Sequence, residues 1–149
     1  MVRGVSLEKE FEALKEWIIQ QIKHKDLFYK KIVKIEEKDN QVIIEYKDKT
    51  HYFFVVPHIT ELNEILMELS PKHNVSLVVY NTKDNLNTII KFWPRISEFP
   101  MFSIYFVNPD SQTDRRWIIY PSTHSKIVEQ SALKQGLFSL FESVEEYKR

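Results

Sequence analysis

The stretch that decides the fold consists of SLVVYNT (76–82), KDNLNTIIKFWPRISEFPM (83–101) and FSIYFVN (102–108). The first and third segments are apolar on both sides of an extended chain, which is typical of central strands in a sheet covered on both faces. The middle segment carries apolar residues at helical spacing, which predicts a helix that Pro94 ends. RRWIIY (115–120) then predicts a strand that pairs back as a hairpin.

The chain before this stretch predicts one amphipathic helix followed by a meander of three strands, YKKIVKIEE, QVIIEYK and HYFFVV, joined by short polar turns. Alternation places every second residue of these strands on one apolar face. A second amphipathic helix after Pro57 is predicted to cover that face. The expected cross-strand pairs are Val33–Tyr46, Ile35–Ile44, Ile44–Phe53 and Val42–Val55.

The last part of the chain predicts a helix over about residues 126–145, in which Gly136 suggests a close approach of another backbone. The predicted order is therefore α-β-β-β-α-β-α-β-β-α. We expect an α/β or α+β fold, a single layered domain over residues 1–149, with a mixed sheet of five to six strands packed by helices.

Composition excludes several classes of protein. The 149 residues contain no Cys, so disulfides and thiolate metal sites are excluded. The only two glycines, at positions 4 and 136, allow no phosphate-binding loop and no dinucleotide fingerprint, and we expect no cofactor. We also expect a cytoplasmic protein, because neither a signal sequence nor a membrane span is visible. The many Lys and Glu residues predict a thermophile.

One candidate function is a metal-dependent nuclease. The order helix, three strands, helix, strand resembles the core of the PD-(D/E)xK superfamily, and Glu45 and Lys47 reproduce its ExK motif. In that family the acidic residues hold a divalent metal ion and the Lys helps to activate water. Here the motif falls on the second strand instead of the third. The expected neighbours of Glu45 across the sheet, Lys34 and Tyr52, supply no second carboxylate.

A second candidate, which we prefer, is a non-enzymatic module that binds single-stranded DNA or RNA. Such modules combine a local basic groove with aromatic rings on which bases stack. The chain carries no net charge, so any basic site must be local. Cationic and aromatic residues interleave in two segments, and the predicted interface consists of Lys91, Trp93, Arg115, Arg116, Trp117, Tyr120, His124 and Lys126.

The segments FVNP, RRWIIYP and STHSKI, in a chain of this size without cysteine, resemble the archaeal single-stranded DNA-binding proteins of the ThermoDBP group and their relatives. The resemblance implies an archaeal protein that holds single strands in a cleft lined by aromatic and basic residues. It does not assign roles residue by residue.

A third candidate is a protein–protein interaction or structural subunit, in which the same aromatic and Arg residues anchor a homodimer or another protein partner. Neutral net charge favours this alternative, whereas the adjacent Arg115 and Arg116 favour nucleic acid. The two tryptophans also have a purely structural alternative, because their periodic spacing is typical of core residues.

Overall fold

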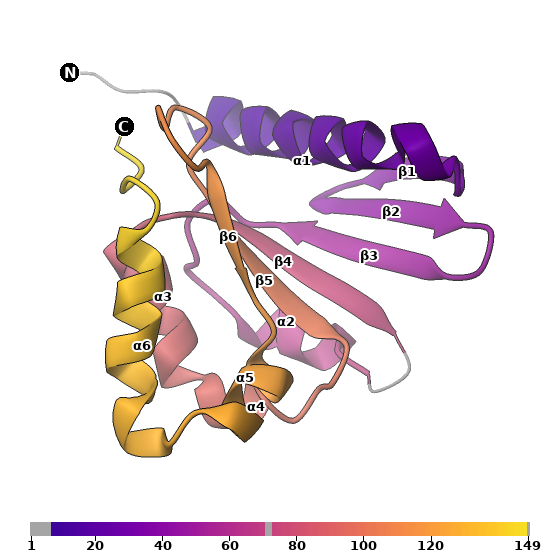
Figure 1. Ribbon diagram of the computed structural model, residues 1–149. Coiled ribbons are helices and arrows are strands. Elements are labelled where there is room, and N and C mark those ends of the chain that lie inside the picture. Colours follow the sequence, from indigo (N-terminus) through magenta and orange to yellow (C-terminus); the bar gives the residue numbers. More distant parts are fainter. Residues whose placement is uncertain (1–6, 71–72, 149) are drawn as a thin grey trace.

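The computed structural model describes residues 7–70 and 73–148 (Figure 1). Its order of helices and strands confirms the predicted one. Two short helices are added, one immediately before β5 and one immediately after β6. The elements are α1 (Leu7–Tyr29), β1 (Ile32–Lys38), β2 (Gln41–Tyr46), β3 (Thr50–Val55), α2 (Asn63–Glu68), β4 (Asn74–Tyr80), α3 (Lys83–Lys91), α4 (Trp93–Ile96), β5 (Phe102–Val107), β6 (Arg116–Ile119), α5 (Pro121–Ile127) and α6 (Gln130–Glu142).

The strands form one six-stranded mixed sheet in which spatial order follows chain order, β1-β2-β3-β4-β5-β6. β1, β2 and β3 are an antiparallel meander, β3, β4 and β5 run parallel, and β6 returns antiparallel to β5. The parallel connections need crossovers, which α2 and the α3–α4 pair supply. The α+β fold with a mixed sheet is therefore confirmed.

Helix α1 covers one face of the sheet. Leu14, Ile18 and Ile22 pack against Ile44 and other alternate residues of β2, β3 and β4. The prediction that the second helix covers this face is wrong. Helix α2 lies in the crossover from β3 to β4, and that crossover passes over the opposite face, where Ile65 packs with residues such as Phe54.

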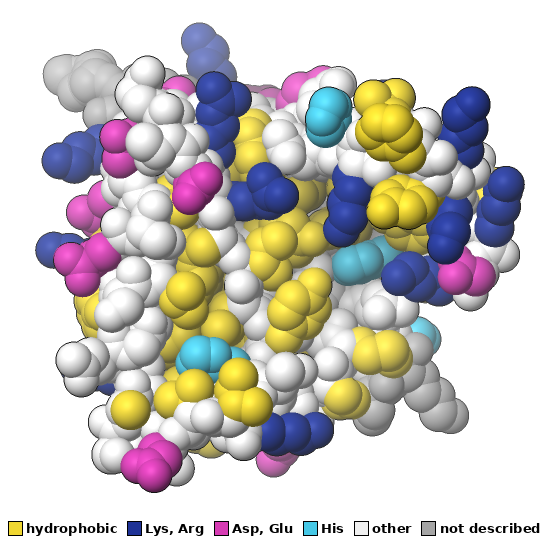
Figure 2. All heavy atoms as spheres, in the orientation of Figure 1, with side chains coloured by type: hydrophobic (Ala, Val, Ile, Leu, Met, Phe, Trp, Pro, Cys, Tyr) yellow, Lys and Arg dark blue, Asp and Glu magenta, His cyan; other side chains and the backbone are white. Residues whose placement is uncertain are grey.

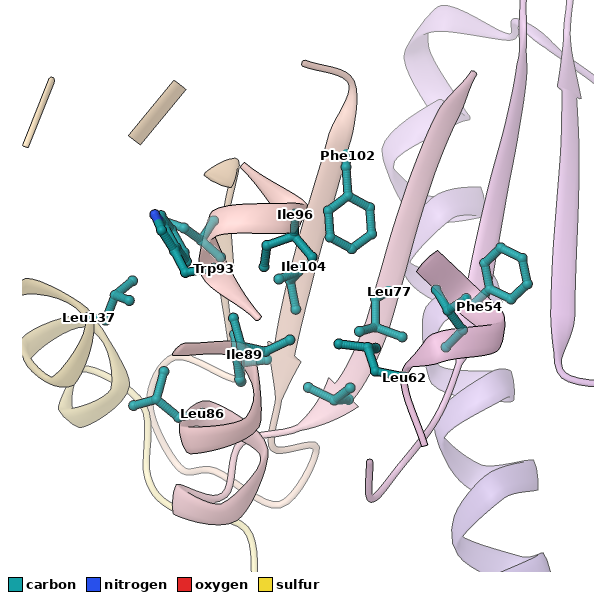
Figure 3. Packing of buried hydrophobic residues seen from close by; sticks show 14 of the residues in the cluster. Phe54, Leu62, Leu77, Leu86, Ile89, Trp93, Ile96, Phe102, Ile104 and Leu137 are labelled. Atoms are coloured by element: carbon teal, nitrogen blue, oxygen red, sulfur yellow. The ribbon is translucent and has the colours of Figure 1, made fainter. Parts of the chain in front are cut away.

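The opposite face carries the larger core, built from β3–β6 together with α2, α3, α4 and α6. Figure 3 shows part of it: Leu86 and Ile89 of α3 lie near Trp93 and Ile96 of the short helix α4, and all four are buried. The helical spacing that predicted this helix therefore reflects burial. β4 and β5 are covered on both faces, as their two-sided apolar sequences predicted.

The predicted pairing between β2 and β3 is wrong by two residues. Ile44 lies opposite His51 instead of Phe53, and Val42 lies opposite Phe53. The cause is a turn at residues 47–48, one residue earlier than expected, which is closed by the Tyr46 N–H donating to the Lys49 carbonyl at 2.7 Å. Because the shift is even, every side chain keeps its predicted face.

Pairing between β1 and β2 places Ile35 opposite Ile44 as predicted, but Val33 does not join the apolar face. The register is irregular between Ile32 and Lys34, so that Ile32 lies opposite Tyr46. Val33 is skipped by this irregularity and is exposed. The edge strand β1 therefore contributes one apolar residue fewer to this face than predicted.

The predicted final helix is two helices, α5 and α6, separated by extended backbone at Val128. Within α6, the expected close backbone approach at Gly136 is wrong. A Cβ added there would meet no atom within 4 Å. This glycine weakens the helix without a packing reason.

The end of the chain is held against the sheet by Asn81, which follows β4 and is fully buried. Its amide nitrogen is shared among the carbonyl oxygens of Phe141, Val144 and Glu145 at 3.0–3.3 Å. Its amide oxygen accepts from the Trp117 indole N–H at 2.8 Å. One side chain therefore links β4, β6 and three carbonyls at and just after the end of α6.

We predict that Gly136→Ala raises the free energy of unfolding by about 1 kcal/mol, because Ala loses less backbone entropy in a helix and here meets open space. Urea denaturation provides the measurement. The matched control is the exposed Ala132→Gly in the same helix, which should lower stability by a similar amount. A destabilised Gly136→Ala would contradict the open environment.

We predict that Asn81→Ala lowers the free energy of unfolding by about 3 kcal/mol or more, because it removes the donor to the Val144 carbonyl and the acceptor of the buried Trp117 N–H. Chemical denaturation measures the loss. Asn87→Ala, at an exposed position of α3, is the control and should change stability by less than about 0.5 kcal/mol. Equal effects at the two positions would refute the linking role of Asn81.

Candidate nucleic-acid interface

The two tryptophans of the predicted interface lie in the core. Trp93 is 4% exposed and Trp117 is 6% exposed. The Trp117 ring stacks on Phe106 with centroids 4.2 Å apart, and its N–H is bonded to Asn81. Neither ring offers a free face, so the prediction that these residues stack bases is wrong. Their regular spacing reflects burial, as the structural alternative holds.

The remaining predicted residues separate onto different faces of the sheet. In β6, alternation sends Trp117 into the large core, while Arg116 lies on the α1 side with Tyr105. Lys91 and Lys126 are exposed on α3 and α5, which belong to the opposite side. His124 of α5 lies there too, with its ring edge-on to Trp93. Arg115 and Tyr120 are exposed at the two ends of β6. The eight residues therefore do not form one surface.

A groove along the C-terminal half of α1 brings basic and aromatic side chains together. It consists of two adjoining hollows of about 240 and 290 Å³ that share Ile22 and Lys25, and we call it the α1 groove. Figure 2 shows this side of the molecule, with Lys and Arg side chains gathered around hydrophobic ones below the end of α1. The other lining residues are Ile18, Gln21, His24, Asp26, Tyr29, Lys31, Tyr46, Asp48, Lys49, Tyr105, Arg116 and Ile118.

The lining of the α1 groove is positively charged although the whole chain is neutral. Four cations, Lys25, Lys31, Lys49 and Arg116, face two carboxylates, Asp26 and Asp48, which leaves two positive charges in excess. Within the described part of the chain none of these cations is in an ion pair. The charge is therefore available to an external anion.

One of the two carboxylates is already engaged in ending the helix. The oxygens of Asp26 accept the backbone N–H groups of Lys31 and Ile32 at 2.9 and 3.1 Å. Lys30, which immediately precedes these two residues, takes a left-handed conformation with φ of 50°, and this turns the chain from α1 into β1. Asp26 thereby holds the end of α1 over the β2–β3 turn, and the groove depends on this position.

The aromatic groups of the groove are tyrosines. Tyr46 lies beneath Lys49, whose ammonium nitrogen is 5.7 Å from the ring centroid. Burial and the neighbouring Tyr120 raise the pKa of Tyr105 to about 12, so this hydroxyl is neutral and a hydrogen-bond donor at pH 7. Tyr29 of the groove is well exposed, at 68%, and so is Tyr120, at 51%, which does not line the groove but lies near Tyr105. These two rings have free faces on which a base can stack.

A chain of polar side chains crosses the sheet on the same face. His51 Nε2 is 2.7 Å from Ser76 Oγ, which is 2.6 Å from Ser103 Oγ. Burial, together with the nearby positive charges of Lys49 and Lys25, lowers the pKa of His51 to about 4. His51 is therefore neutral at pH 7, although cations of the groove act on it.

The ExK motif has no partner for a metal site among its neighbours. Glu45 lies opposite Lys34, as predicted, and opposite Thr50 instead of Tyr52, because of the shifted register. Among residues 7–70 and 73–148, no three His, Asp or Glu side chains are placed to hold a metal ion together. The nuclease hypothesis therefore gains no support from the geometry around Glu45.

Comparison with known proteins adds no assignment. The sequence matches no protein-family model, and neither a curated protein nor a solved structure is significantly similar to it. The ThermoDBP resemblance therefore remains a prediction. In the described part of the chain, no helix combines the length and the apolar character that crossing a bilayer requires.

The residues of the α1 groove that were not predicted come from two other segments. HKDLFYKK (24–31) and EYKDKTHYF (45–53) alternate basic and aromatic residues as densely as the segments that were chosen. The same signal was therefore present there. What distinguishes the segments is exposure: the end of α1 points out of the fold, whereas the tryptophan segments supply the core.

We predict that His51 makes the protein sensitive to mild acid. Because the folded pKa lies below the ordinary value of 6.5, its contribution is present above pH 6.5 and is lost as pH falls toward 4. The loss is about 3 kcal/mol in the free energy of unfolding. Urea denaturation at several pH values between 7 and 4 measures this. The free energy of unfolding of His51→Gln should fall over that range by about 3 kcal/mol less than that of the unmodified protein.

The control is His24→Gln, at an exposed position of α1, which should decline as the unmodified protein does. Parallel declines of the unmodified protein and His51→Gln would show that the buried ring has no part in the acid sensitivity.

Proposed function

We propose that this protein binds single-stranded nucleic acid in the α1 groove and carries out no chemistry on it. The observation that carries the proposal is the set of four cations without ion-pair partners in the described chain, bordering two adjoining hollows in a neutral protein. Phosphates provide the opposite charge, and the release of their counterions drives such binding.

The tyrosines favour single strands over duplexes. Tyr29 and Tyr120 expose ring faces near the groove, and stacking a base on an aromatic ring contributes about 1–3 kcal/mol. Bases within a duplex are already stacked and cannot use these rings. Two of the residues predicted from the sequence, Arg116 and Tyr120, keep their proposed roles as a phosphate contact and a stacking ring.

The proposal agrees in kind with the ThermoDBP resemblance, which implies an aromatic and basic cleft. We also propose that the protein comes from a thermophilic archaeon and acts in its cytoplasm, as the resemblance and the composition predict. The nuclease alternative makes a separate claim: Mg²⁺ or Mn²⁺ should produce cleavage that Glu45→Gln abolishes.

One observation favours a protein partner as the second candidate. Leu27 and Phe28, at the end of α1, are 62% and 93% exposed, and large exposed apolar side chains at one place are typical of interfaces. A stable homo-oligomer or stoichiometric partner, together with no affinity for oligonucleotides, would support this candidate over nucleic acid.

We predict that a labelled single-stranded oligonucleotide binds with strong salt dependence. If the four cations each neutralise one phosphate, affinity falls about 50-fold between 50 and 200 mM salt. Lys25→Ala combined with Lys49→Ala should weaken binding at low salt and roughly halve the logarithmic slope. Fluorescence anisotropy at several salt concentrations measures both quantities.

The matched control is Lys91→Ala combined with Lys126→Ala, which removes the same charge from the other side of the sheet. This variant should keep the slope. A slope that falls only in the control would move the site to the predicted α3–α5 surface, and no binding at low salt would end the proposal.

A further inference from the structure

β1 is one edge of the sheet, and its outer side has no partner strand in the described part of the chain. Figure 1 shows this strand beside the end of α1. It is seven residues long, whereas β6, at the other edge, has four. A free edge exposes a row of backbone N–H and C=O groups, to which a further strand can add.

The turn after β1 determines which backbone groups face outward. Lys38 and Gln41 flank the two-residue turn between β1 and β2, so they form a hydrogen-bonded pair of the ladder. Such pairs alternate with pairs that exchange no hydrogen bonds. Ile35 and Glu37 therefore point their N–H and C=O groups away from β2. An added strand has to place its own free backbone groups opposite these.

Apolar side chains are left uncovered along this edge. A hollow of about 370 Å³ lies between the end of α1 and β1, and Leu27, Ile32 and Ile35 form its apolar part. Leu27 is 62% exposed, and Val33, which the irregular register excludes from the apolar face, is 59% exposed. The rest of the lining consists of Lys23, Asp26 and Lys30. Covering the apolar side chains would favour the addition of a strand.

The charges of β1 favour a second copy of the same strand. Charged residues on an edge strand often prevent pairing, but here their order is complementary to itself. Lys34 and Glu36 lie on one face, are exposed and take part in no ion pair among residues 7–70 and 73–148. When two β1 strands run antiparallel with Ile35 opposite Ile35, each Lys34 lies opposite Glu36 of the other copy.

Other registers bring like charges together. A shift by two residues is the smallest that keeps free backbone groups opposite each other. In one direction it places Lys34 opposite Lys34, and in the other it places Glu36 opposite Glu36. Like charges directly opposite are destabilising, so the sequence of β1 favours a single register.

We propose that this protein forms a two-fold symmetric dimer in which the β1 strands of two copies pair antiparallel, with Ile35 opposite Ile35 and Lys34 opposite Glu36. The pairing joins the two six-stranded sheets into one. It places the two Ile35 side chains next to each other on the α1 side, beside the hollow. None of these three residues lines the α1 groove, so the test is separate from nucleic-acid binding.

Analytical ultracentrifugation of the full chain at low salt measures the dimer, at protein concentrations up to about 1 mM. Lys34→Glu and Glu36→Lys should each weaken the dimer at least about tenfold, because each turns two attractive charge pairs into two repulsive ones. An equimolar mixture of the two variants should form the dimer again, because Lys then faces Glu at both places. Recovery in the mixture also shows that both variants are folded.

The matched control is Lys38→Glu, which makes the same change of charge in the same strand. In the proposed register Lys38 lies opposite Ile32, so this variant should keep the dimer. A protein that stays monomeric at every concentration would overturn the proposal and would leave the edge to a strand of another protein. A dimer that Lys34→Glu and Glu36→Lys leave intact, or two variants that do not associate when mixed, would overturn it as well.

A dimer that Lys38→Glu weakens more than Lys34→Glu would overturn the register, because Lys38 would then face a charged residue.

Discussion

The hydrogen bonds of Asn81 are the constraint on which the rest of the structure depends. The end of a helix exposes carbonyl groups that the helix itself cannot satisfy, and burying them requires a donor from elsewhere. Asn81 supplies that donor from the end of the central strand and also accepts the Trp117 N–H of the edge strand. The last helix, the edge strand and the large core are therefore assembled around one amide, and Trp117 is kept inside as part of that assembly.

This arrangement also decides where a ligand has access. Open sheets with parallel strands usually bind ligands outside the carboxyl ends of those strands. Here the chain's own last segment lies there: Tyr147 donates its backbone N–H to Asn81 O, stacks on Tyr80 at 3.6 Å and bonds the buried Glu10. One hollow of the α1 groove lies beside the β2–β3 turn, at the start of β3. The other borders Tyr105 and Arg116 on the α1 face of the sheet, where the last segment of the chain does not line it.

Local rules predicted much of the fold and little of the site. Alternation assigned Ile44 and Phe53 to the correct face even though their register was wrong by two residues, because parity is a property of each strand alone. Periodicity likewise marked Trp93 as helical. It could not show that Trp93 is enclosed by α5 and α6, whereas Tyr29 stands free at the end of α1. Whether a side chain is exposed depends on which segments from distant parts of the sequence pack against it. The same holds for the presence of Lys25 and Arg116 in one hollow, because they come from α1 and β6.

The neutral net charge sets how the α1 groove would work. At physiological ionic strength charges are screened beyond about 8 Å, so a local excess of two positive charges attracts a strand only at close range. A duplex would meet the same excess with its phosphates alone, while the tyrosine faces stayed unused. A single strand gains both contributions at once. With so small a charge excess, selectivity for single strands therefore rests on the rings, and the cations mainly fix the position of the backbone.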